Sequence, residues 1–240
     1  MEVHHHPKAE KKRFKEYFFE FLMIFLAVTL GFFAENIREH YVERSRAGEL
    51  ARSLIKDLQS DTSKLNWTIS MRRNMLADNN TLLAELKIAS AKQDVGMIQV
   101  LVAKISRPWY YLPFSGTYEQ IKNSGSLRYF SSALSGRLTT YEQNNKQIEV
   151  AQDLEKDYLN STINPFLFTK LNMHYIESLN NKEAYNESTG FKRNDPFIMD
   201  DLYTVAIYLK SSAEFLIYLL NMKKSEALKN INLLQKEYHL

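Results

Sequence analysis

The chain has 240 residues, of which 31 are Lys or Arg and 28 are Asp or Glu, so its formal net charge is only +3. That small excess gives no reason to expect a nucleic-acid partner, and the absence of cysteine excludes disulfides and thiolate metal sites. With 7 glycines and 5 prolines the chain has few of the turn-forming residues that a many-stranded sheet needs, so the composition favours an all-α fold.

Residues 1–15 form a basic tail that contains three consecutive histidines, His4, His5 and His6. Adjacent imidazoles can bind a transition metal, but no carboxylate or other fourth ligand is fixed nearby. A tail without a physiological metal site is therefore the preferred interpretation. We expect neither a metal nor any other cofactor.

Residues 16–36 are predicted to form a transmembrane helix. The 18 residues from Tyr17 to Ala34 contain a single charge, Glu20. At ~1.5 Å per residue they span roughly 27 Å, close to the ~30 Å hydrocarbon core of a bilayer. A cleaved signal peptide would have a shorter apolar region and a small-residue cleavage site, and a soluble core helix is rarely apolar on every face. The pattern indicates an uncleaved membrane anchor.

The charges on either side of this helix predict its orientation. The tail holds five basic residues, and four arginines follow the span by residue 52, so the positive-inside bias is slight. A short basic tail is nonetheless costly to translocate, whereas a long domain crosses largely regardless of its charge. We expect a single-pass protein with its N-terminus in the cytoplasm and residues 37–240 on the other side of the membrane.

One narrow stripe of the predicted span carries small and acidic residues. At ~100° per residue, the following positions lie within about 60° of Glu20: Ile24, Ala27, Gly31 and Glu35. Small residues four apart let two helices approach closely in lipid, which favours a self-association or partner-binding face. The alternative is that the two carboxylates simply mark the two membrane interfaces.

Beyond the span the helix is predicted to continue, because no proline occurs between residues 7 and 108. Apolar residues recur at spacings of three, four and seven over residues 50–86, which is typical of an amphipathic helix with one apolar stripe. Charged residues stand between them, among them Asp61 and Arg72. An alternative interpretation places a break in this helix at residues 77–81.

Four further helices are predicted in chain order, and the turn residues between them set their ends. Ser115 or Thr117 can cap a short helix that stops at a left-handed Gly125, and Ser131 or Ser132 begins a longer one. The predicted ranges are 95–105, 117–122, 132–165 with a possible kinked continuation to Leu171, and 197–240, with polar residues 174–196 as an exposed loop. The expected architecture is a membrane helix continuing into an antiparallel helical bundle over residues 37–240.

The connection after residue 105 is rich in aromatic side chains. Those that could line a small-molecule pocket are Trp109, Tyr110, Tyr111, Phe114 and Tyr118. The alternative, which is the commoner arrangement, is that this cluster closes the end of the helical bundle.

Catalytic signatures are missing from the sequence. It has no Gly-rich phosphate loop, no His-Glu-x-x-His and no Gly-x-Ser-x-Gly, and His174 stands alone at a helix end. We therefore predict no catalytic residues and a protein that is not an enzyme.

Three segments carry a family resemblance: the opening "HHHPKAEKKRFKEYFFEFLMIFLAVTLGFFAENIREH", then "LIKDLQSDT", and later "TYEQIKNSGSLRYF". Together they resemble a family of uncharacterised single-span membrane proteins from Bacteroidota, over most of the chain. The resemblance implies a bacterial inner-membrane location and a native histidine run. It implies no catalytic residue.

Three functions are compatible with this sequence. The leading one is a membrane-anchored helical interaction protein, a scaffold or accessory subunit that binds a protein partner or forms a homo-oligomer. The second is a ligand-sensing module outside the cytoplasm, and the third is a subunit of an oligomeric pore that uses Glu20 and Glu35.

Overall fold

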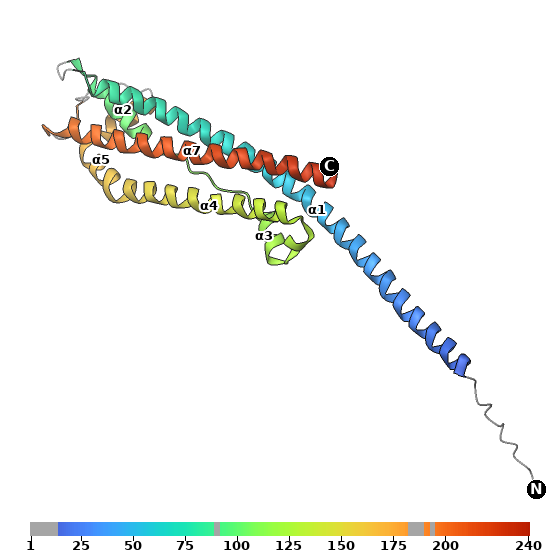
Figure 1. Ribbon diagram of the computed structural model, residues 1–240. Coiled ribbons are helices and arrows are strands. Elements are labelled where there is room, and N and C mark those ends of the chain that lie inside the picture. The colour runs from blue at the N-terminus through green and yellow to red at the C-terminus, as the bar shows by residue number, and fades with distance from the viewer. Residues whose placement is uncertain (1–13, 89–91, 182–189, 193–194) are drawn as a thin grey trace, which may run out of the picture. The chain divides into compact units, whose positions relative to one another are not determined.

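The computed structural model describes residues 14–88, 92–181, 190–192 and 195–240 (Figure 1). Within these ranges the chain is helical and has no strand, and a long apolar helix stands at its N-terminal end. The prediction of an all-α protein with such a helix is confirmed. The three histidines of the tail lie outside the described residues.

The chain divides into two compact units, Met1–Glu49 and Leu50–Leu240. The first helix belongs to both units, and every other described element belongs to the second. In chain order the elements are α1 (Phe14–Glu85), α2 (Val95–Ile105), α3 (Gly116–Asn123), the 3₁₀ turn η2 (Ser126–Tyr129), α4 (Ser132–Tyr158), the π-helical turn η3 (Leu159–Ile163), α5 (Asn164–Lys170), α6 (Met173–Asn181) and α7 (Ile198–Tyr238).

Two of these helices, α1 and α7, are long and apolar enough to cross a membrane by length and composition. None of the apolar window of α1 is buried within the chain, whereas part of the window of α7 is. The two helices therefore meet this criterion in different surroundings: α1 leaves its apolar segment uncovered, and α7 contributes to the core of the second unit.

Helix α1 runs through the polar segment at residues 77–81 without a break. Thr81 Oγ1 donates to Ala77 O at 3.0 Å, and Asn79 is fully buried. Leu82 and Leu83 belong to a core cluster just beyond. Packing of this turn against the core overrides the weak helix propensity of its Asp, Asn and Thr residues.

In the second unit α4 and α7 lie against each other in opposite directions, yellow and red in Figure 1. Near one end Ser212 Oγ of α7 donates to Glu155 Oε1 of α4 at 2.8 Å. Near the other end Arg137 Nε of α4 donates to Asn230 Oδ1 of α7 at 3.2 Å. The part of α1 after residue 50 packs with both. Its Leu54 and Leu58 join a core cluster that holds residues of α3, α4 and α7.

The core of this unit has two large apolar clusters and a smaller one. One large cluster gathers residues of α1, α2, α5 and α7, and the other gathers residues of α1, α3, α4 and α7. The third cluster contains only six buried residues, listed here in full: Leu65, Ile69, Tyr111, Ile148, Leu219 and Leu220. Buried charges accompany this smaller cluster, as the next section describes.

Two stretches differ from their predicted form. The helix expected over residues 132–165 ends as α4 at Tyr158 and is followed by the π-helical turn and α5. Pro165 cannot donate to the carbonyl four residues earlier, and the wider π turn just before it accommodates the change. The segment expected to be a loop from residue 174 begins instead with α6, which buries Ile176 in the core. Residues 182–189 and 193–194 of that segment lie outside the described part of the chain.

Candidate functional site

An extended segment, residues 108–115, connects α2 to α3 without helix or strand; we call it the strap. Pro108 and Pro113 each remove a backbone donor and favour an extended chain. Because buried peptide groups need hydrogen-bond partners, an extended segment without a neighbouring strand depends on side chains for them. Those side chains come from α1 and α4.

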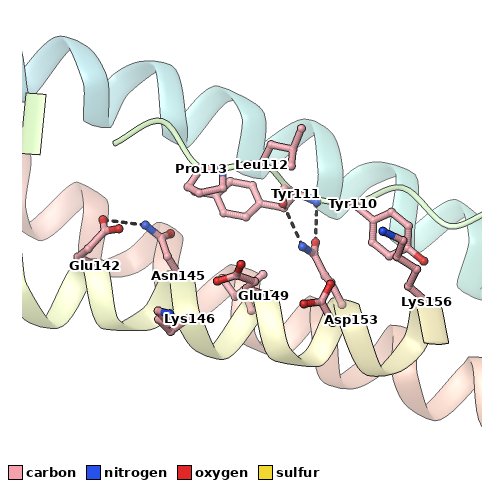
Figure 2. Close-up of a pocket in the computed structure, with 12 residues that line it drawn as sticks. Tyr110, Tyr111, Leu112, Pro113, Glu142, Asn145, Lys146, Glu149, Asp153 and Lys156 are labelled. Atoms are coloured by element: carbon pink, nitrogen blue, oxygen red, sulfur yellow. Dashed lines mark hydrogen bonds between the residues drawn. The ribbon is translucent and has the colours of Figure 1, made fainter. Parts of the chain in front are cut away.

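The first half of the strap is held by Arg72 and Gln152. Arg72 Nε donates to the carbonyl oxygen of Trp109 at 2.8 Å. The amide of Gln152 accepts from Tyr111 N at 2.6 Å and donates to Tyr111 O at 3.1 Å, the pair of dashed lines in Figure 2. This side-chain amide therefore takes the place of a neighbouring strand.

The second half is held by Asp61, a residue of α1 that is only 1% exposed. Its carboxylate accepts from Phe114 N at 3.1 Å and from the hydroxyl of Tyr111 at 2.6 Å. The hydroxyl of Tyr141, on α4, also donates to it. Asp61 thus joins the strap to two helices through three donors, which compensates the cost of burying a carboxylate.

Lys223 of α7 completes this cluster. Its ammonium lies 4.0 Å from Asp61 Oδ2, donates to Tyr141 O at 3.2 Å, and stands 3.4 Å from the centroid of the Tyr141 ring. Burial lowers the pKa of Lys223 to about 8, although the Asp61 charge opposes this change.

The two tyrosines of the cluster stay protonated, so their hydroxyl groups can donate hydrogen bonds. Burial, and then the negative charge of Asp61, raise the pKa of both Tyr111 and Tyr141 far above the ordinary value for tyrosine. Because Asp61 and Lys223 have at most 1% of their surface exposed, a substrate in solution cannot reach them. The cluster fastens the strap to the helices.

A second buried ion pair lies further along the same three helices. Arg72 Nη1 lies 2.8 Å from Glu155 Oε1, and Arg72 Nη2 lies 2.8 Å from Glu155 Oε2. Ser212 Oγ of α7 also donates to Glu155 at 2.8 Å. The ring of Tyr110 lies 5.5 Å from the Arg72 guanidinium carbon, and burial raises the pKa of this tyrosine to about 12.

Between the strap and α4 is a pocket of about 390 Å³ (Figure 2). Strap residues form one side and α4 residues the other. The lining residues are Tyr110, Tyr111, Leu112 and Pro113 from the strap, and Glu142, Asn145, Lys146, Ile148, Glu149, Gln152, Asp153 and Lys156 from α4.

The structure distributes the five predicted aromatic residues among different environments. Tyr110 and Tyr111 line the pocket. Trp109 packs edge-on against Trp67 at 5.0 Å, and Phe114 lies under the Lys64 ammonium at 5.0 Å. Tyr118 is buried in a core cluster. Trp109, Phe114 and Tyr118 are therefore not brought into the pocket.

The charged residues that hold the strap were not predicted from the sequence. The sequence pattern placed Asp61 and Arg72 among the charges beside the apolar stripe of α1, but the structure buries both almost completely. Each falls at a spacing of three, four or seven from core residues of the same helix, such as Leu58 and Leu65. A charged residue at a core position of the helical repeat was the sequence feature that could have predicted this burial. Glu155 and Lys223 show the same pattern on α4 and α7.

In the first unit the predicted stripe of small and acidic residues lies on α1. Glu35 pairs with Arg38 one turn later. A methyl group added at Gly31 would meet no atom within 4 Å. Ile24, Ala27 and Gly31 are all exposed within this unit.

Across the described ranges, no group of three or more His, Asp or Glu side chains is arranged to hold a metal ion. No family model matches the chain, and no curated protein or solved structure is significantly similar to it.

Proposed function

We propose that this protein is a membrane-anchored helical interaction module, a scaffold or accessory subunit that self-associates in a bacterial inner membrane. The observation that carries the proposal is the apolar window of α1, which finds no cover within the described chain. An apolar segment of this length is stable in water only if lipid or protein covers it.

Gly31 supports self-association. A glycine inside a helix costs roughly 0.5–1 kcal/mol relative to alanine. No atom of the described chain uses the space that its missing side chain leaves open. A second helix that approaches closely along Ala27 and Gly31 would use that space, as small residues four apart do in membrane helix pairs.

The environment of α7 supports a single membrane span. This helix carries Lys223 and Asn230, both fully buried, and it lines the core along its length. Lys223 is buried beside Asp61 and Tyr141, which partner its ammonium. In lipid, α7 would lose these partners, and an unpaired lysine is costly there. We therefore infer that α7 is a helix of the domain outside the membrane.

Topology can be tested cleanly because the chain contains no cysteine. In the proposed orientation, a membrane-impermeant maleimide added to spheroplasts labels Ser161→Cys but not Glu10→Cys, and it labels Tyr218→Cys on the exposed side of α7. Labelling at Glu10→Cys in intact spheroplasts would reverse the orientation. Protection of Tyr218→Cys, with Ser161→Cys labelled, would indicate that α7 lies in the membrane.

Self-association is tested by cross-linking the full-length protein in native membranes. Gly31→Leu should reduce the cross-linked dimer at least about fivefold, because it blocks close helix approach. Leu26→Phe adds bulk to the same helix away from the stripe and is the matched control, so it should leave the dimer unchanged. Equal cross-linking in the wild type and Gly31→Leu would exclude this face as the interface.

A further inference from the structure

The pocket between the strap and α4 has the size of a small-molecule site. Its volume of about 390 Å³ lies within the ~300–1,000 Å³ of typical ligand pockets. One wall is built from Tyr110, Leu112 and Pro113, which offer apolar and aromatic surface. A ligand that fits this wall has an apolar or aromatic body.

The shape of this wall is set in advance by the contacts that hold the strap. Gln152 makes two hydrogen bonds to the backbone of Tyr111, and the hydroxyl of the same tyrosine is bonded to Asp61. A wall that is already ordered does not lose conformational entropy when a ligand binds, which favours affinity.

The opposite wall, on α4, carries a small excess of negative charge. Three carboxylates line it, those of Glu142, Glu149 and Asp153, against two lysines, Lys146 and Lys156. The net charge of the lining is therefore −1, and the carboxylates offer more acceptors than the lysines neutralise. A cationic group on the ligand suits this wall better than an anionic one.

Asn145 gives an independent indication of what the pocket accepts. Its side chain lines the pocket, is about nine-tenths buried, and donates from Nδ2 to Glu142 Oε2 at 2.8 Å (Figure 2). Since a carboxylate can only accept, this contact fixes which way the amide points. Asn145 Oδ1 is left without a hydrogen-bond partner among the described residues. A buried acceptor without a partner is unfavourable, so a ligand donor that reaches Oδ1 after a small shift of the Asn145 side chain toward the pocket would be bound preferentially.

We propose that this pocket binds a small organic amine, with its ammonium group beside Asn145, Glu142 and Glu149 and its apolar body against Tyr110 and Leu112. The site is a property of the second unit and does not depend on self-association through α1. Binding and oligomerisation can therefore fail or succeed separately.

The test compares three probes of one shape on the full-length protein in nanodiscs at pH 7. Phenethylamine carries the proposed cation, 3-phenylpropanoate replaces it by an anion, and 2-phenylethanol is neutral. Calorimetric or ligand-observed NMR titrations should show phenethylamine binding at least about 10-fold more tightly than either of the others. Equal or tighter binding of the anion or of the alcohol would overturn the proposal, as would the absence of binding by all three.

Variants locate the site. Asn145→Leu and Glu149→Gln should each weaken phenethylamine binding about 10-fold, because the first removes an acceptor for the ammonium and the second removes a negative charge beside it. Asp157→Asn removes the same charge from the same helix at an exposed position outside the lining, and its binding should stay within about twofold of the wild type. Glu149 is also exposed, so its variant should keep the fold and remain informative if Asn145→Leu is destabilised. Equal weakening by Glu149→Gln and Asp157→Asn would show only a general charge effect and would overturn the assignment.

Discussion

The ammonium of Lys223 lies 4.0 Å from Asp61 Oδ2, and neither side chain exposes more than 1% of its surface. The pair joins α7 to α1 at the level of the smallest apolar cluster. Because Asp61 also accepts from Tyr111 and Phe114, the same carboxylate holds the strap. Loss of the Asp61 charge would leave the Lys223 ammonium buried without its partner.

Asp61→Asn should therefore destabilise the protein strongly. We expect the free energy of unfolding to fall by about 3–5 kcal/mol, since an uncompensated buried lysine remains. Urea denaturation followed by circular dichroism measures this. Asp57→Asn, which removes a carboxylate that accepts from Thr117 N at the start of α3, is the matched control and should cost about 1 kcal/mol. Equal losses in the two variants would contradict the central role of Asp61.

The lowered pKa of Lys223 predicts an alkaline dependence of stability. Between about pH 8 and the ordinary lysine value of 10.5, the folded protein has released this proton and the unfolded chain still holds it. The free energy of unfolding therefore rises with pH in that window, by up to about 2 kcal/mol between pH 8 and 10.

The tyrosines reverse this trend above the ordinary tyrosine value of 10.0, because Tyr111 and Tyr141 keep their protons in the folded state and lose them on unfolding. Stability should pass through a maximum near pH 10. Urea denaturation from pH 7 to 11 tests this: Lys223→Met should abolish the rise, and its neighbour variant Lys224→Met should retain it. A rise that survives in Lys223→Met would show that another group causes it.

The Arg72–Glu155 pair should behave as a unit. Arg72→Met alone leaves the Glu155 carboxylate buried and should cost about 3–5 kcal/mol. The double variant Arg72→Met/Glu155→Leu removes both charges and should be more stable than Arg72→Met. A double-mutant cycle in urea measures the coupling. Additive losses would mean that the two charges do not stabilise each other.

Asn79 predicts a stabilising substitution. It is fully buried next to a large apolar cluster, and neither of its amide atoms has a hydrogen-bond partner among the described residues. Asn79→Leu removes these unsatisfied groups and should raise the free energy of unfolding by about 1–3 kcal/mol.

Asn80→Leu, one residue later and exposed, is the control for this substitution and should change stability by less than about 0.5 kcal/mol. Thermal melts of both variants provide the measurement. A destabilised Asn79→Leu would indicate that the buried amide is satisfied by a bound water or that the cavity cannot hold the larger side chain.

Local features of the fold could be predicted from the sequence because their causes lie within a few residues. Apolar periodicity and the scarcity of proline and glycine predicted an all-helical chain with a long apolar helix at its start. Gly125 adopts the expected left-handed conformation, with φ of 68°, after α3. Ser131 accepts from Leu134 N at 3.2 Å as the cap of α4. Caps and turns of this kind form inside one short segment.

The candidate site depended on contacts between segments far apart in the chain. Arg72 and Glu155 are separated by 83 residues, and Tyr111 and Asp61 by 50. A charge in the register of a helical core is stable only if a distant partner neutralises it, and periodicity does not reveal that partner. Even Ser115, one of the two predicted caps of α3, makes no side-chain cap; Asp57 accepts from Thr117 N instead.

The sequence by itself determined the all-helical class and the long apolar helix at the start, because hydrogen bonds, caps and apolar stripes act along the chain. Only the tertiary structure decided which charges are buried, which aromatic residues face the pocket and which way the strap runs. Tyr110 and Tyr111 line the pocket while Trp109 packs against Trp67, although all three belong to one short aromatic run. The difference arises because Gln152 and Asp61, on two different helices, fix the strap at Tyr111.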